Sequence, residues 1–209
     1  MFKSTEEIIA HKIKEAIDTT KSLRLDQKEN QGKKILELAC GLGALSKILK
    51  DNGHYVVSCD DLNYDPPDHE FCSHNQLLYK HANKFFNWPR HHFFIDFPHH
   101  EHVKANLKMF EDLKTHGNNY DLIIIQSLPI WQYNKITIEC TKFFIHNLME
   151  FLDDQGKILL GYVPHEGFQQ DKNFESSESY TWLNQWRTSD YEQCIGYYMW
   201  EIPKEKKIQ

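Results

Sequence analysis

The stretch KKILELACGLGALSKILKDNGHYVVSCDD, residues 33–61, holds the pattern that decides the fold. It opens with KILELA, an apolar run typical of a short buried strand, and continues into a loop with two glycines. ALSKILKDNG then has helical spacing and ends at a glycine, and HYVVSCDD is typical of a second strand, closed by two aspartates. Strand, helix and strand in this order predict a βαβ unit with parallel strands.

The rest of the chain continues this alternation. A capping-box pattern from Ser4 to Glu7 predicts a helix over residues 5–20. The apolar segment YDLIIIQSL, residues 120–128, predicts a central parallel strand that is covered on both faces. A long helix is expected over residues 135–156 and a fifth strand, KILLGYV, over residues 157–163. Near the C-terminus, SYTWLNQW is ambiguous between helix and strand, whereas YEQCIGYYMWEI alternates like a strand, which favours an antiparallel hairpin.

These elements predict an α/β fold, a Rossmann-like doubly wound and mostly parallel sheet with helices on both faces and a C-terminal antiparallel hairpin. The 209 residues fit one domain. We divide it into an N-terminal helix and linker (1–32), a core (33–163) and a C-terminal strand region (164–209).

Charge and composition narrow the class of protein. The 24 basic and 30 acidic residues give a formal net charge of -6, so nucleic acid would be reached only through partners. Five cysteines without a CxxC pair favour a reduced, intracellular protein of the cytoplasm or nucleus. No apolar run has the length of a membrane span, so no membrane contact is expected. The histidines have neither HExxH spacing nor a CxxC companion, so no metal site is expected.

Small and acidic residues follow the predicted strands where a doubly wound sheet binds its ligands. Gly41 and Gly43 leave the first strand, where missing side chains let a ligand approach the backbone. Asp60 or Asp61, at the end of the second strand, can accept hydrogen bonds from both hydroxyls of a ribose. Asp96 ends the third predicted strand, HHFFID, where a carboxylate can accept from an adenine amino group. Together they predict a pocket for an adenosine-containing molecule.

This series of acids and glycines resembles the class I S-adenosylmethionine-dependent methyltransferases over roughly residues 33–163. ILELACGLG is similar to the first motif of that family, with Glu37 as its acidic residue. The resemblance implies that Glu37 and the loop hold the methionine end of S-adenosylmethionine, Asp60 or Asp61 the ribose, and Asp96 the adenine. The loop consists of Ala39, Cys40, Gly41, Leu42 and Gly43.

A nicotinamide dinucleotide is the competing cofactor, because its fingerprint shares the glycines and the ribose acid. That fingerprint also requires a third glycine, which allows the helix to pack closely on the strand. Here Gly43 is followed by Ala44, Leu45 and Ser46, so the methyl donor is favoured.

The residues after the fourth strand usually hold the methyl acceptor in this family. Relatives that act on amino groups carry Asn or Asp there, followed by two prolines and an aromatic residue. In this chain Gln126, which we count with the cofactor site, is followed by SLPIW, and no catalytic base is evident.

Two accounts of function follow. In the first, the chain is an S-adenosylmethionine-dependent methyltransferase of unknown acceptor, with Gln126, Trp131 and Tyr133 shaping the acceptor pocket. The intact glycine loop and the three acids favour this account. In the second, it is a catalytically inactive scaffold or regulator with protein partners, in a complex that modifies DNA or RNA. The altered motif after the fourth strand favours this one.

Overall fold

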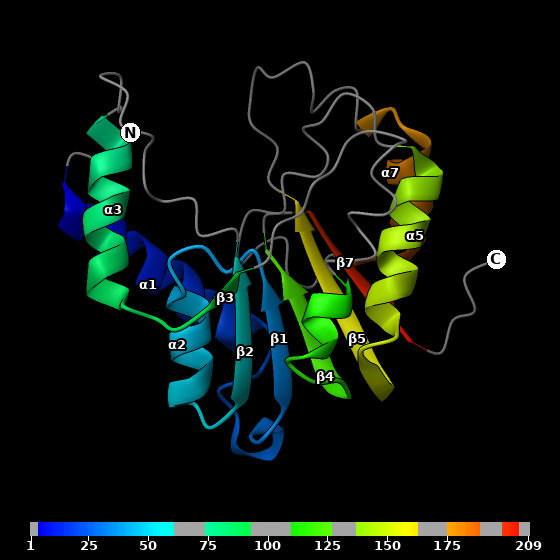
Figure 1. Ribbon diagram of the computed structural model, residues 1–209, viewed down its shortest axis with the longest axis horizontal. Helices are drawn as coiled ribbons and strands as arrows, with labels where there is room; N and C mark the ends of the chain where they lie inside the picture. The colour runs from blue at the N-terminus through cyan, green and yellow to red at the C-terminus, as the bar shows by residue number, and fades with distance from the viewer. Residues whose placement is uncertain are drawn as a thin grey trace.

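The computed structural model describes residues 4–60, 74–92, 110–126, 137–162, 175–188 and 198–204. Within these residues, seven strands form one sheet in the order β3-β2-β1-β4-β5-β7-β6 (Figure 1). The strands are β1 (Lys34–Leu38), β2 (Tyr55–Asp60), β3 (His91–His92), β4 (Tyr120–Ile125), β5 (Leu152–Tyr162), β6 (Arg187–Thr188) and β7 (Tyr198–Pro203). The first five run parallel, and β7 pairs antiparallel with both β5 and β6. The predicted Rossmann-like fold and its C-terminal antiparallel pair are confirmed.

The strand order reverses between β1 and β4. After β1, the chain adds β2 and β3 on one side, then returns to place β4 on the other side of β1. Ile35 to Leu38 pair with Leu122 to Ile125 across this junction. In an open α/β sheet, the crevice at such a reversal is where ligands bind.

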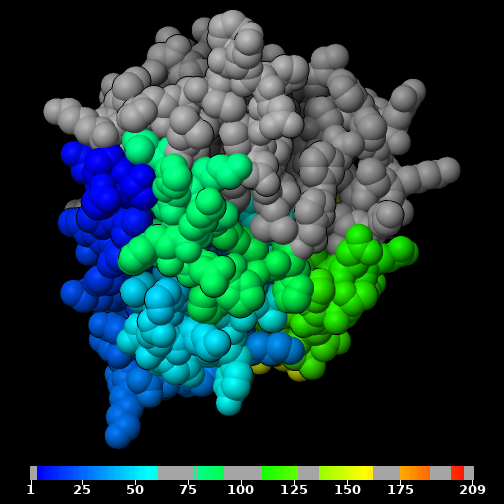
Figure 2. All heavy atoms as spheres, turned by 60° about the vertical axis from the view of Figure 1, so that its left-hand side comes forward, coloured from blue at the N-terminus to red at the C-terminus, as the bar shows by residue number. Residues whose placement is uncertain are grey.

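Three helices cover one face of the sheet: α1 (Thr5–Ser22), α2 (Ala44–Asp51) and α3 (His74–Phe86). The predicted cap of α1 is present, because the Ser4 hydroxyl accepts a hydrogen bond from the Glu7 backbone N–H. Side chains from all three helices share a core with the residues of β1 and β4 that point to this face, among them Ile35 and Ile124. In Figure 2, α3 and the residues after it (green) lie against α1 (blue) and α2 (cyan).

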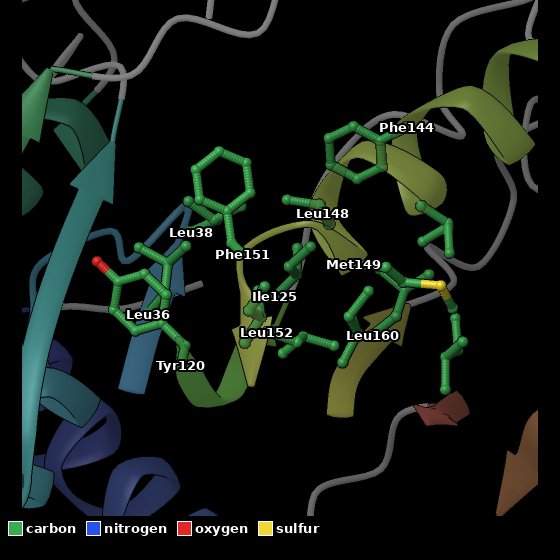
Figure 3. Packing of buried hydrophobic residues seen from close by; sticks show 14 of the residues in the cluster. Leu36, Leu38, Tyr120, Ile125, Phe144, Leu148, Met149, Phe151, Leu152 and Leu160 are labelled. Atoms are coloured by element: carbon green, nitrogen blue, oxygen red, sulfur yellow. The ribbon is translucent and has the colours of Figure 1, made fainter. Parts of the chain in front are cut away.

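The opposite face is covered by α5 (Ile138–Met149), α7 (Glu178–Leu183) and a helical segment at residues 110–114. Leu36 and Leu38 of β1 and Leu160 of β5 point to this side and pack with Phe144 and Leu148 of α5 (Figure 3). Neighbouring residues of β1 therefore belong to different cores, as the two-residue repeat of a strand requires. A sheet buried on both faces explains why β1 and β4 are apolar almost throughout.

The predicted boundary between the long helix and the fifth strand is wrong. The helix α5 ends at Met149 and β5 already begins at Leu152, with a shift of register before Lys157. Gly156 permits this irregular strand, since a Cβ there would lie 2.6 Å from the backbone oxygen of Tyr120. The sequence pattern extended the helix because Phe151 and Leu152 fit its apolar spacing, although both are buried in the sheet core instead.

The ambiguous segment before the last strand is helical. SYTWLNQW forms most of α7 and a 3-10 turn, η4 (Asn184–Trp186), before β6. The Ser177 hydroxyl caps α7 by accepting from the Tyr180 backbone N–H. None of the helices in the described part of the chain is long and apolar enough to cross a membrane.

Candidate functional site

The predicted glycine loop leaves β1 at the reversal point and leads directly into α2 (Figure 1). Its backbone is left-handed at three positions, with φ of 54° at Ala39, 55° at Gly41 and 77° at Gly43. Gly43 is the N-cap residue of α2, and its N–H donates to the carbonyl oxygen of Cys40 at 2.9 Å. A loop that turns this sharply needs glycine at two of these positions, and Ala39 adopts its conformation at a cost in strain.

Asp60 lies at the end of β2 beside this loop. Its Oδ2 accepts a hydrogen bond of 2.7 Å from the Gly41 N–H, and its residue is 6% exposed. The Cys40 N–H also donates to the Cys59 carbonyl, which continues the β1–β2 pairing into the loop. The structure therefore brings the predicted loop and one of the two predicted ribose acids into direct contact.

Glu37 lies beneath the loop rather than on its surface. It is 2% exposed and accepts a hydrogen bond from the Ser46 hydroxyl in the first turn of α2. Burial raises the pKa of Glu37 to about 8; hydrogen bonds from the Ser46 side chain and backbone oppose the rise, and the nearby Asp60 carboxylate adds to it. Because Gly43 has no side chain to cap α2, Glu37 accepts instead from the buried backbone N–H of Ser46 in the first turn. The expectation that Glu37 binds the methionine end of a cofactor stays a prediction.

A chain of hydrogen bonds runs from Glu37 to the other side of the loop. The Ser46 and Ser58 hydroxyl oxygens are 2.5 Å apart, and Ser58 accepts from the indole Nε1 of Trp88 at 2.7 Å. The Ser46 hydroxyl has a single proton, which it donates to Glu37. The Ser58 hydroxyl is therefore the donor between the two serines, and it accepts from the indole N–H of Trp88.

Trp88 also explains why residue 43 is glycine. A Cβ at this position would lie 2.6 Å from the Trp88 Cβ and 2.7 Å from its Cδ1. The sequence argument expected the missing side chain to make room for a ligand. In the structure, the space on the Cβ side of Gly43 is filled by the indole of Trp88. The Lys50 ammonium lies 5.5 Å from the centre of the same ring.

Arg90 is the second side chain that holds the loop from this side. Its Nη1 donates to the carbonyl oxygen of Gly41 and its Nη2 to Oδ1 of Asn83 in α3. Its charge lies close enough to Glu37 to lower the pKa of that carboxyl against the effect of burial. Neither Trp88 nor Arg90 was predicted from the sequence, because the WPR tripeptide after α3 carries no distinctive motif.

Gln126 follows β4 and faces the N-terminal helix. Its side-chain amide donates to the Thr19 hydroxyl of α1 at 2.8 Å, and Thr19 is almost fully buried. Gln126 therefore joins the end of the fourth strand to α1. The remaining acids of the predicted pocket, Asp61 and Asp96, lie outside the described residues, as do Trp131 and Tyr133.

Cys40 belongs to the loop but is unsuited to act as a nucleophile. Its thiol is buried, and burial, with help from the carboxylates of Glu37 and Asp60, raises its pKa far above the ordinary range. Burial likewise raises the pKa of Cys59 to about 12. Both thiols are packing groups behind the loop. In the described ranges, no three His, Cys, Asp or Glu side chains are grouped closely enough to hold a metal ion.

Comparisons with known proteins give only distant structural matches. No family model and no curated protein matches the sequence. Among solved structures, a TehB-like S-adenosylmethionine-dependent methyltransferase from Corynebacterium glutamicum is 20% identical, covers 75% of this chain and 70% of its own, and has a TM-score of 0.40. A putative methyltransferase of the same cofactor class from Streptococcus mutans is 16% identical, covers 88% of this chain and 48% of its own, and has a TM-score of 0.45.

A protein from Pyrococcus horikoshii OT3 is 18% identical, with a TM-score of 0.41 over 70% of this chain; the match spans 56% of that protein. These identities and TM-scores are too low to assign an activity, so the functional argument depends on the contacts of the loop. The strand order, the helices on both faces and the antiparallel β7 confirm the Rossmann-like fold that the resemblance to class I methyltransferases implied.

Proposed function

We propose that this chain binds S-adenosylmethionine at the carboxyl ends of β1 and β2 and transfers its methyl group to an acceptor. The observation that carries the proposal is the 2.7 Å hydrogen bond between the Gly41 N–H and the Asp60 carboxylate. It joins a left-handed glycine turn to an acid of the neighbouring strand at the point of sheet reversal. An adenosine ligand needs both of these features: a backbone that it can approach closely, and a carboxylate that binds its ribose.

The residues present fit such a ligand. A carboxylate offers about four lone-pair positions, so Asp60 can accept from ribose hydroxyls as well as from Gly41. The turn at Gly41 has no side chain to obstruct an approaching ligand. Because Trp88 fills the Cβ side of Gly43, a ligand would meet the loop from the side of Gly41 and Asp60.

The chemistry that the cofactor supplies is an activated methyl group on a sulfonium. Its transfer disperses positive charge, so alignment of donor and acceptor provides much of the rate. The residues of this chain would hold the cofactor and orient it toward the acceptor. Asp60 would fix the ribose, the Gly41–Gly43 backbone the adjoining part of the cofactor, and Gln126 would border the acceptor side.

Calorimetric titration with S-adenosylmethionine and its demethylated product, S-adenosylhomocysteine, tests the proposal. The wild type should bind both, and Asp60→Asn should weaken binding about tenfold to a hundredfold, because it loses hydrogen bonds to a charged acceptor. Asp51→Asn is the matched control, since Asp51 is an exposed carboxylate at the far end of α2 and pairs only on the surface with Lys47. No heat from the wild type at millimolar ligand, or equal affinity in both variants, would contradict the assigned site.

A second candidate, a methyltransferase fold that binds partners without catalysis, is favoured by Gln126. The amide of this residue is engaged by Thr19 of α1. Incubation with methyl-labelled cofactor and cell extract, followed by separation of nucleic acid, protein and small molecules, distinguishes the two. Label in one fraction that falls with Asp60→Asn supports the enzyme. Binding without transfer, together with a stable copurified partner, supports the scaffold.

A further inference from the structure

The segment after α3, residues 87–90, contacts the glycine loop through two side chains. Asn87 has a left-handed φ of 41°, which ends α3, and Pro89 prevents the helix from continuing. Trp88 and Arg90, on either side of this proline, both turn toward the loop. The segment thus contributes two side-chain contacts with the glycine loop that do not follow from the order and pairing of the strands.

The two contacts of Gly41 fix its backbone on both sides. Its N–H, in the peptide group before the Cα, is bound to Asp60, and its C=O, in the peptide group after the Cα, accepts from Arg90. A rotation about either backbone dihedral of Gly41 would break one of these hydrogen bonds. Glycine has the widest conformational freedom of any residue, so Gly41 needs such external restraint to hold one conformation.

Arg90 is itself held by α3. Its second guanidinium nitrogen donates to Asn83, one turn before the end of that helix. Leu78, Ala82 and Phe86 of α3 pack with α1 and α2 in the core of this face. The position of the guanidinium over Gly41 is therefore set by a packed helix.

Trp88 acts in the same way on Gly43. The ring lies in contact with the glycine, and its N–H binds Ser58, the first hydroxyl of the hydrogen-bond chain to Glu37. Trp88 thus contacts Gly43 directly and is joined to the buried carboxyl of Glu37 through the two serines.

We infer that Trp88 and Arg90 are positioning residues that set the affinity of the glycine loop for an adenosine ligand. The inference rests on the proposed function. A loop held in its binding conformation before the ligand arrives loses less conformational entropy on binding, so preorganisation appears directly as affinity. Neither residue is assigned a direct contact with the ligand.

An affinity series tests the inference. Arg90→Lys keeps the charge but not the two-pronged geometry, and Asn83→Ala removes one of the contacts that hold the guanidinium. Calorimetry with S-adenosylhomocysteine should show about tenfold weaker binding for Arg90→Lys and a smaller loss for Asn83→Ala, with the melting temperature close to that of the wild type. Lys84→Ala, an exposed basic residue of the same helix, should bind like the wild type.

The indole of Trp88 provides a spectroscopic test that distinguishes a role in ligand binding from a role in stability alone. If ligand binding engages the loop that Trp88 covers, S-adenosylhomocysteine should change the tryptophan fluorescence. Because Trp131, expected in the acceptor pocket, can respond as well, this change should be clearly smaller in Trp88→Phe and unchanged in Trp182→Phe. Trp182 is the control because it lies on α7, over the other face of the sheet.

The outcomes separate the inference from the proposed function. No binding by the wild type overturns both. Wild-type binding with unchanged affinity in Arg90→Lys and Asn83→Ala overturns only the positioning role, as does a fluorescence change of the same size in Trp88→Phe as in the wild type. Weaker binding in the affinity series, with the signal reduced in Trp88→Phe but not in Trp182→Phe, supports it.

Discussion

Replacing Glu37 by glutamine should change how the stability of this protein depends on pH. In the folded state burial raises the pKa of Glu37 to about 8, compared with 4.5 for an unperturbed carboxyl. Between these two values the unfolded chain loses the proton while the folded chain keeps it. The folded state then binds more protons than the unfolded state, so the free energy of unfolding falls as the pH rises. The loss of stability caused by burying the Glu37 charge is absent below pH ~4.5 and reaches its full size near pH ~8.

The size of this stability change follows from the one proton by which the folded and unfolded states differ. One proton corresponds to about 1.4 kcal/mol per pH unit, so Glu37 should lower stability by about 2–3 kcal/mol between pH ~5.5 and ~7.5. Glutamine has nearly the shape of the protonated acid and no charge to bury. Its carbonyl can still accept from Ser46, the partner that Glu37 has now.

Urea unfolding of wild type and Glu37→Gln at pH 5.5, 6.5 and 7.5 measures this effect. The advantage of the glutamine variant should grow by about 2–3 kcal/mol across the series. Every other titratable group occurs in both proteins, so its contribution cancels in the difference. Glu111→Gln, at an exposed position of the 110–114 helical segment, should follow the wild type at every pH. A constant difference between wild type and Glu37→Gln would refute the argument that the buried carboxyl is protonated at neutral pH.

Three further substitutions test single features of the backbone and of the strand ends. Ala39→Gly should raise the free energy of unfolding by about 0.5–1 kcal/mol in urea, because it relieves the φ of 54°; a loss of stability would contradict this. Gly156→Ala should lower the melting temperature by several degrees, since the added Cβ would lie 2.6 Å from the Tyr120 carbonyl oxygen; an unchanged melting temperature would show that β5 shifts freely. Gln126→Ala should cost about 1–2 kcal/mol, because the buried Thr19 hydroxyl loses its donor, and equal stability would mean that the contact contributes nothing.

The sequence contained most of what places the site. The apolar runs predicted β1, β2 and β4, and the two-residue repeat explains how β1 serves both cores. Parallel strands bring their carboxyl ends to one edge, so topology alone predicted that the loop lies near the aspartates at the end of β2. The choice between Asp60 and Asp61 did not follow from topology, because it depends on which carboxylate turns toward Gly41.

The contacts that the sequence missed join residues far apart in the chain through side chains of no distinctive pattern. Arg90 reaches Gly41 across 49 positions and Trp88 reaches Ser58 across 30. Neither follows from helix or strand periodicity, because residues 87–90 have no regular structure. Gly43 shows the consequence. The sequence could show that the position needs a glycine, but not that an indole of the same chain occupies the space.

The loop contacts also separate the question of fold from the question of activity. The hydrogen-bond chain from Trp88 through Ser58 and Ser46 to Glu37 stabilises the loop whether or not a cofactor binds. The pH dependence of Glu37→Gln therefore tests the buried half of the loop, and an inert member of the fold would show it too. Under the proposed function, affinity for S-adenosylhomocysteine would depend in addition on Asp60, the carboxylate that binds the Gly41 N–H. Suppose that Glu37→Gln shows the expected pH dependence while the wild type does not bind S-adenosylhomocysteine. The chain would then have kept the architecture of the site without its ligand, and this result would favour the scaffold.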